Sequence, residues 1–161
     1  MLIVLALFST LVLLSVSFFH EQNLEQQAEL LITQVEQAFQ YAQAQSILQA
    51  EPVVFCGSHE GKICDGDWSY FQRVQALTSH RLFKRFSVRN PHFDLVWQSS
   101  LGRNDQLIWN ADGSSQQQGT FYVCSRSGDP SLVRGIILLE SGRFRLKKDF
   151  ETLPAACQEI E

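Results

Sequence analysis

The stretch that decides the fold is residues 1–50, MLIVLALFSTLVLLSVSFFHEQNLEQQAELLITQVEQAFQYAQAQSILQA, which contains neither Gly nor Pro. Because no helix breaker interrupts it, the stretch predicts one continuous helix. Residues 1–19 are almost wholly apolar, and at about 1.5 Å per residue they match the thickness of a bilayer core. We therefore expect residues 1–19 to be the membrane-spanning half of this helix.

Residues 20–50 have a different pattern. Their apolar side chains form a stripe with spacings of three and four, while Glu and Gln fill the other faces; the stripe consists of Leu24, Ala28, Leu31, Val35, Phe39 and Ala42. This spacing is typical of an amphipathic helix that buries one face. We expect residues 20–50 to pack against residues 51–161, which are long enough for one globular head.

The apolar start has two ordinary interpretations. A cleaved secretory signal would carry basic residues before its apolar core, but the chain has no Lys or Arg before Lys62. A single-span membrane anchor fits the length, but it does not explain why an amphipathic stripe follows without a break.

Charge is unevenly distributed along the chain, whose net charge is −4. All 13 Lys and Arg residues lie at or after Lys62, whereas part of the 17 acidic residues precede it. The head is therefore slightly basic and the helix acidic. Since this excess is small, it does not by itself indicate a nucleic-acid partner, and any such prediction depends on local clustering.

The four cysteines all lie in the head, at Cys56, Cys64, Cys124 and Cys157. No two have the spacing of a zinc knuckle and the His residues are scattered, so we expect no metal site. An even number outside a membrane helix indicates disulfides in an oxidising compartment; the alternative is buried free thiols in a cytosolic domain. Three connectivities are open. We favour Cys56 with Cys64, closing a Gly-rich loop, and Cys124 with Cys157, tying the final segment to a strand.

After residue 51, short apolar runs alternate with turn signals, which predicts a β-rich head. The predicted strands are residues 52–56, 82–88, 120–125, 132–139 and 143–147, with a hairpin of residues 93–98 and 106–109 around residues 99–104 and a segment of uncertain type near residues 71–77. The predicted fold class is α+β, a long N-terminal helix packed on a C-terminal antiparallel β-sheet or sandwich.

Several motifs share one family resemblance. Residues 56–68, CGSHEGKICDGDW, resemble the Cys, short Gly loop, Cys, Trp signature of the FimT/GspH family of minor pilins and pseudopilins. Residues 119–124, GTFYVC, followed by residues 136–145, IILLESGRFR, resemble the last strands of that family, including its Gly-Arg-x-Arg motif. The similarity extends from the helix to about Leu146, and the order and spacing of the motifs make it specific.

The resemblance implies a third interpretation of the apolar start, a pilin-type helix that lies in the membrane before assembly and in the filament core afterwards. Family members begin as prepilins, with a basic leader followed by Gly-Phe-Thr-Leu-Ile-Glu. Residues 1–7, MLIVLAL, read like the residues that follow that Glu. We therefore expect the printed sequence to start at an internal Met, a few residues into the mature pilin; a native N-terminus at Met1 would contradict this.

The head has no recognisable catalytic pattern, so we expect neither enzyme activity nor a cofactor. The resemblance implies a minor pilin of a type IV pilus, or a minor pseudopilin acting as a structural tip subunit of a type II secretion filament. In both cases other major and minor pilins would bind the N-terminal helix. The protein would span the inner membrane with a periplasmic head, and a pilus would carry it to the cell surface.

The sharpest functional signal is the basic run RFRLKK at residues 143–148. If it is a strand, Arg143, Arg145 and Lys147 project from one face at about 7 Å intervals, a spacing that can follow the phosphates of a nucleic-acid strand. Lys148 continues the run. Because DNA-receptor members of the family bind through the Gly-Arg-x-Arg tail, the resemblance implies non-specific DNA binding for uptake in natural transformation.

Further candidate DNA-binding residues are Lys84 and Arg85, in the predicted strand 82–88, and Arg103, in the predicted hairpin tip. The ordinary alternative is that all these cations lie on solvated strand faces and pair with nearby acidic residues such as Asp149. In the purely structural alternative, the head contacts other pilins through exposed aromatic residues; the candidates are Trp97, Trp109 and Tyr122.

Overall fold

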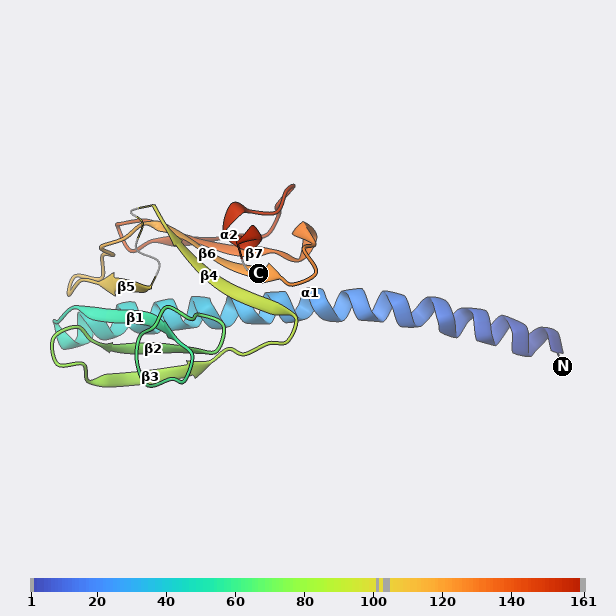
Figure 1. Cartoon of the computed structure of the whole chain (residues 1–161), viewed down its shortest axis with the longest axis horizontal. Helices are drawn as coiled ribbons and strands as arrows, with labels where there is room; N and C mark the ends of the chain where they lie inside the picture. Colours follow the sequence, from blue (N-terminus) through green and yellow to red (C-terminus); the bar gives the residue numbers. More distant parts are fainter. Residues whose placement is uncertain (1, 101, 103–104, 160–161) are drawn as a thin grey trace.

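The computed structural model describes the backbone of residues 2–100, 102 and 105–159, and the side chains of residues 22–100, 102 and 105–159. One continuous helix, α1 (Leu2–Gln49), is the longest element, and the β-rich head packs against one face of its C-terminal half (Figure 1). Among the residues whose side chains the structure describes, no helical segment is both long enough and apolar enough to cross a membrane. The predicted membrane-spanning residues 1–19 lie outside those side chains.

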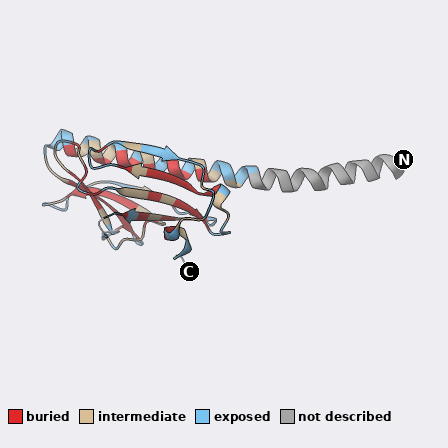
Figure 2. Ribbon diagram, turned by 90° about the horizontal axis from the view of Figure 1, so that it is seen from above, coloured by how far each residue is buried: buried red, intermediate tan, exposed pale blue. Residues whose placement is uncertain are grey.

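The predicted apolar stripe is the buried face of α1. Ala28, Val35, Phe39 and Ala42 are fully buried, and Leu31 is 5% exposed. The exposed surface of the described helix is mostly polar, with the glutamines Gln22, Gln26, Gln37 and Gln40, but it also carries the exposed apolar side chains of Leu30, Ile47 and Leu48. The helical spacing therefore predicted the correct buried face, which Figure 2 shows turned toward the strands.

The head contains two antiparallel four-stranded sheets. In the first sheet the strand order is β3-β2-β1-β5, and in the second it is β4-β6-β7-β8. The strands of the first sheet are β1 (Val53–Ser58), β2 (Phe71–Ala76), β3 (Leu82–Ser87) and β5 (Gln106–Trp109). Those of the second are β4 (Phe93–Ser99), β6 (Gly119–Ser125), β7 (Arg134–Leu138) and β8 (Phe144–Lys147). A 3-10 turn, η1 (Pro130–Leu132), and a short helix, α2 (Ala155–Gln158), complete an α+β fold, as predicted.

The predicted hairpin of residues 93–98 and 106–109 is wrong. β4 pairs with β6, and β5 pairs with β1, so the two segments belong to different sheets. Trp97 of β4 is 1% exposed and Trp109 of β5 is fully buried, so neither is the exposed contact residue that the structural alternative required. The physical reason is that both Trp side chains are buried in the core between the two sheets. Each strand reaches this core from its own sheet, so the two strands cannot pair with each other. Tyr122 is half-buried.

The core is centred on Phe39 of α1. Its ring lies edge-on to four other aromatic rings at centroid distances of 5.4 to 6.0 Å. Two of them, Phe55 and Trp109, come from the first sheet, and Phe121 and Phe144 come from the second. Edge-to-face pairs stabilise a core beyond their area of contact. A single helical side chain thus joins the cores of both sheets.

Both favoured disulfides are present. Cys56 of β1 is bonded to Cys64, which closes the loop after β1, and Cys124 of β6 is bonded to Cys157 of α2. The first disulfide holds a Gly-rich loop against the first sheet. The second holds the C-terminal segment against the face of the second sheet that points away from α1.

Candidate nucleic-acid interface

The predicted basic strand is β8, the edge strand of the second sheet. Its register pairs Leu138 with Phe144 and Ile137 with Arg145. Because side chains alternate along a strand, Phe144 points into the core, where it contacts Phe39, and Arg145 and Lys147 point to the opposite face. Both cations are exposed. The expected alternation therefore holds for Phe144, Arg145 and Lys147, whereas Leu146, on the same face as Phe144, is 40% exposed.

Arg143 immediately precedes β8, and the glycine before it fixes its position. Gly142 has a φ of +78°, and a Cβ there would overlap the carbonyl oxygen of Gly113. Gln43 of α1 holds both glycines, since its amide donates to the carbonyl oxygens of Gly113 at 2.7 Å and Gly142 at 3.2 Å. Only glycine combines this backbone angle with this close approach. Gly142 therefore determines the position of Arg143, the first arginine of the motif.

The side chains of Arg143 and Arg145 form no hydrogen bond or ion pair with any described residue, although the backbone carbonyl of Arg143 accepts a hydrogen bond from Leu139 N–H at 2.9 Å. Nearby acidic residues such as Asp149 therefore do not pair with either guanidinium group, as the alternative of solvated, ion-paired strand faces would require. Lys147 Nζ lies 4.8 Å from the ring centre of Phe150, which in turn packs 5.9 Å from Tyr122. The strand thus presents three uncompensated cations beside two aromatic rings.

Lys148 has a different role from its predicted one. Its Nζ lies 2.9 Å from Glu29 of α1, which also accepts a hydrogen bond from Arg134 Nε at 2.8 Å. Burial raises the pKa of Glu29, but the hydrogen bonds and charges of Lys148 and Arg134 outweigh burial and lower that pKa below its usual value. Lys148 therefore ties the residue after β8 to the helix, while its side chain remains 55% exposed.

Lys84 and Arg85 do not join this surface. They lie on β3, the edge strand of the first sheet, which Figure 1 shows on the other side of α1 from β7. Lys84 Nζ is 5.1 Å from the ring centre of Tyr41 of α1, whereas the Arg85 guanidinium is 5.2 Å from that of Phe71, on the opposite face of β3. The prediction for Arg103 lies outside the described residues.

The sequence analysis missed two arginines that the structure makes important. Arg134 has a side chain only 4% exposed and joins β7 to α1 through Glu25 and Glu29. Arg73 of β2 is 8% exposed. Neither has another Lys or Arg close to it in the sequence, and such clustering was the only signal used to select candidate residues. In the part of the chain that the structure describes, no group of three or more His, Cys, Asp or Glu residues could hold a metal ion.

Comparisons with known proteins give a consistent result. Residues 31–142 match the family described as "Type II transport protein GspH". A crystal structure of the Pseudomonas aeruginosa type IV minor pilin FimU matches with a TM-score of 0.62 and 19% identity, over 87% of this chain and 98% of that one. A second crystal form gives 0.57 and 20%, over 81% and 97%. No curated protein matches the chain significantly. At this identity the likeness to FimU shows a shared fold, and the family match ends just before β8.

Proposed function

The chain belongs to the GspH family of minor pilins and pseudopilins, and on that basis we propose that it is a type IV minor pilin that binds DNA through β8. The single observation that carries the proposal is the row of three exposed cations formed by Arg143, immediately before β8, and by Arg145 and Lys147 within it, without an acidic partner among the described residues. The uptake of DNA in natural transformation, together with pilus assembly, is the proposed biological role.

The chemistry of this face favours phosphate over bases. Alternate residues of a strand are about 7 Å apart, so the three cations can contact successive phosphates. The amide and carboxylate of this sheet face, Gln98 and Asp94, lie on β4 at the opposite edge from β8, and Asp94 is already bound by Arg126, so neither is placed beside the cations to read base edges. Binding would then be independent of sequence, weak for one subunit and strongly reduced by salt, because the DNA releases counterions when its phosphates are neutralised. Several subunits in one filament would raise the overall affinity.

The proposed location follows from the family. The N-terminal part of α1 would lie in the inner membrane before assembly, with the head in the periplasm, and the protein would reach the cell surface within a pilus. Other pilins would contact α1. The outer face of the second sheet, which carries β8, points away from α1, so DNA and a neighbouring helix would use different surfaces of the subunit.

The test is DNA binding by the full chain in a nonionic detergent, with disulfides intact. Fluorescence anisotropy of labelled duplexes with unrelated sequences, measured over a salt series, gives both affinity and its salt dependence. For three phosphate contacts, the slope of log K against log salt is about −2.7. Replacing Arg143→Ala and Arg145→Ala together should reduce the magnitude of this slope by about 1.8 and weaken binding equally for every sequence.

The control must remove the same charge elsewhere. Lys62→Gln combined with Arg89→Gln serves this purpose, because both side chains are exposed and lie outside the second sheet. This variant should retain the slope and most of the affinity. Unchanged binding in the β8 variant, or an equal loss in the control, would refute the proposal.

A second candidate function is that of a structural tip subunit in a type II secretion filament. The description of the matched family favours it, and the matched residues end at Gly142, so the match itself does not include the basic strand. The absence of DNA binding at low salt would favour this candidate. Neighbouring genes for secretion, in place of competence genes, would favour it as well.

A further inference from the structure

Arg73 of β2 is a buried cation without a carboxylate partner among the described residues. Its guanidinium donates to the carbonyl oxygen of Gly61 at 3.1 Å and to Gln75 Oε1 at 2.9 Å. Its Nε is buried and has no hydrogen-bond partner. Arginine is rarely buried unless it is paired, because an uncompensated charge in the interior is costly. Two neutral acceptors leave this charge uncompensated.

The surroundings of Arg73 increase the positive charge. Arg85 lies directly across the β2–β3 pair from Arg73, and Lys62 and His80 line the cavity beside it. Burial lowers the pKa of Arg73, and the charge of Arg85 lowers it further. None of the described residues that line this cavity is acidic. Glu60 pairs with Lys62 at 3.1 Å, whereas the two acceptors of Arg73, the Gly61 carbonyl and Gln75 Oε1, are neutral.

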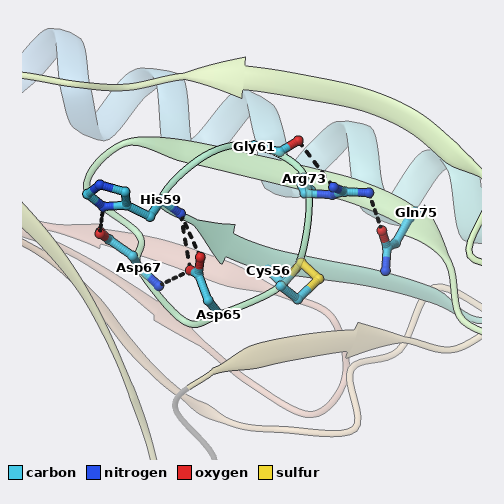
Figure 3. The surroundings of a disulfide bond; sticks show 8 residues. Cys56, His59, Gly61, Asp65, Asp67, Arg73 and Gln75 are labelled. Atoms are coloured by element: carbon cyan, nitrogen blue, oxygen red, sulfur yellow. Dashed lines mark hydrogen bonds and ion pairs between the residues drawn. A yellow bond between two sulfur atoms is a disulfide. The ribbon is translucent and has the colours of Figure 1, made fainter.

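Next to Arg73 is a cavity of about 340 Å³ on the face of the first sheet that points away from α1. One wall is apolar and includes Val54, Ile63 and Leu77. Ile63, in the loop closed by the Cys56–Cys64 disulfide, is 68% exposed. Figure 3 shows Arg73 between the Gly61 carbonyl of this loop and Gln75 of its own strand.

The loop that forms the wall is held in place on both sides. The disulfide ties Cys64 to β1, and the Asp65 carboxylate accepts hydrogen bonds from the backbone N–H groups of His59 and Asp67. Arg73 itself holds the loop through Gly61. Because these contacts fix the wall before any ligand arrives, little ordering is required on binding.

We propose that this cavity binds a carboxylate carried on a short aliphatic group, with Arg73 as its counter-ion. A carboxylate matches the planar fork of a guanidinium, and the aliphatic part would cover Ile63 and Leu77. The volume lies within the range of small-ligand cavities. The ligand is either a free aliphatic acid or an acidic side chain beside an apolar one in a protein segment. This inference is independent of DNA binding, since it uses the other sheet.

The first experiment observes Arg73 directly, by nitrogen-15 NMR of the full chain in a nonionic detergent with intact disulfides. We expect 4-methylpentanoate to shift the Arg73 Nε–H and Gln75 side-chain amide resonances in a saturable way. The neutral 4-methylpentanamide should shift neither, and inorganic phosphate should bind at least tenfold more weakly because it has no apolar part. The absence of a saturable shift with 4-methylpentanoate would overturn the proposal.

A second titration distinguishes the sources of the carboxylate. The peptide acetyl-Leu-Glu-Leu-amide is compared with its Gln-containing equivalent, which has the same size and no charge. Tighter binding of the Glu peptide than of 4-methylpentanoate supports a protein segment as the ligand, and the reverse supports a free acid. Equal binding of the Glu and Gln peptides together with no response to 4-methylpentanoate would contradict the site.

Variants test the role assigned to Arg73. Arg73→Gln should abolish carboxylate binding and Arg73→Lys should retain it with a loss of about tenfold, while thermal unfolding shows that each variant is folded. Ile63→Ser, at an exposed loop position, should weaken binding several-fold and tests the apolar wall even if Arg73→Gln does not fold. The double variant Arg143→Ala with Arg145→Ala should leave carboxylate binding unchanged. Full binding by a folded Arg73→Gln variant would refute the assignment.

Discussion

Arg134 Nε lies 2.8 Å from Glu29 Oε1, and this ion pair joins the first residue of β7 to the middle of α1. The two residues are separated by 105 positions in the sequence. The arginine side chain is 4% exposed, whereas that of the glutamate is 34% exposed. The pair therefore fixes the position of β7 along the axis of α1.

The first prediction concerns pH. Because the pKa of Glu29 is lowered in the folded state from its ordinary value of 4.5, Glu29 stabilises the fold fully above that value. Stability is lost as the pH falls from about 4.5 through the lower, folded-state pKa. Glu29→Gln should flatten this part of the stability profile, as measured by denaturant unfolding at several pH values. Glu60→Gln, at an exposed pair with Lys62, is the control and should leave the profile unchanged.

The second prediction concerns the glycine of the basic motif. Gly142→Ala introduces both backbone strain and an overlap with Gly113, whereas Gly128→Ala introduces strain alone, since its φ is +73° and nothing lies within 4 Å of its Cβ. Gly128→Ala should cost about 1 kcal/mol, and Gly142→Ala at least about 2 kcal/mol more. Thermal and denaturant unfolding measure both. Equal costs would show that the contact with Gly113 has no energetic role.

The third prediction is a stabilising substitution. Gln72 is fully buried, and neither its Nε2 nor its Oε1 has a hydrogen-bond partner. Such unsatisfied groups cost about 1–3 kcal/mol, so Gln72→Met should stabilise the fold by about that amount. Gln75→Met on the same strand is the control, because it removes an acceptor of Arg73 and should destabilise the fold. A lower midpoint of unfolding for Gln72→Met would contradict the prediction.

The fourth prediction compares the two disulfides. The Cys124–Cys157 bond closes a sequence separation of 33 residues and the Cys56–Cys64 bond one of 8. In the chain-entropy description, their removal costs about 3.7 and 2.5 kcal/mol. Cys124→Ser with Cys157→Ser should therefore lower the free energy of unfolding more than Cys56→Ser with Cys64→Ser. The opposite order would indicate that the loop after β1 contributes native contacts that depend on its disulfide.

Much of the fold follows from periodicity in the sequence. The stripe from Ala28 to Ala42 identified the buried helical face, and alternation in residues 143–147 identified the two faces of β8. Periodicity describes one element at a time and contains no information about its partner. The wrong hairpin of β4 and β5 has this cause, since both segments are strands but each pairs with another.

The candidate site was predictable where neighbours in sequence are neighbours in space. Arg145 lies in β8 and Arg143 immediately before it, so their arrangement follows from local geometry. The partner of Lys148 is Glu29, 119 residues away, so sequence spacing could not indicate that this cation is already used. Arg73 was missed for another reason: Gly61 is only 12 residues away, but Arg73 stands alone in the sequence, and its nearest cation, Arg85, lies on the neighbouring strand.

The contacts of Phe39 with rings from both sheets have a mechanical consequence. When a filament extends or retracts, force is applied along its helices, and in this subunit α1 enters the head between the two sheets. Tension along α1 would be transmitted to both sheets through the ring of Phe39, and each sheet would resist this tension in shear. The head and the helix would therefore carry load as one body, and a subunit that lost the ring of Phe39 would yield at the junction before its strands separated.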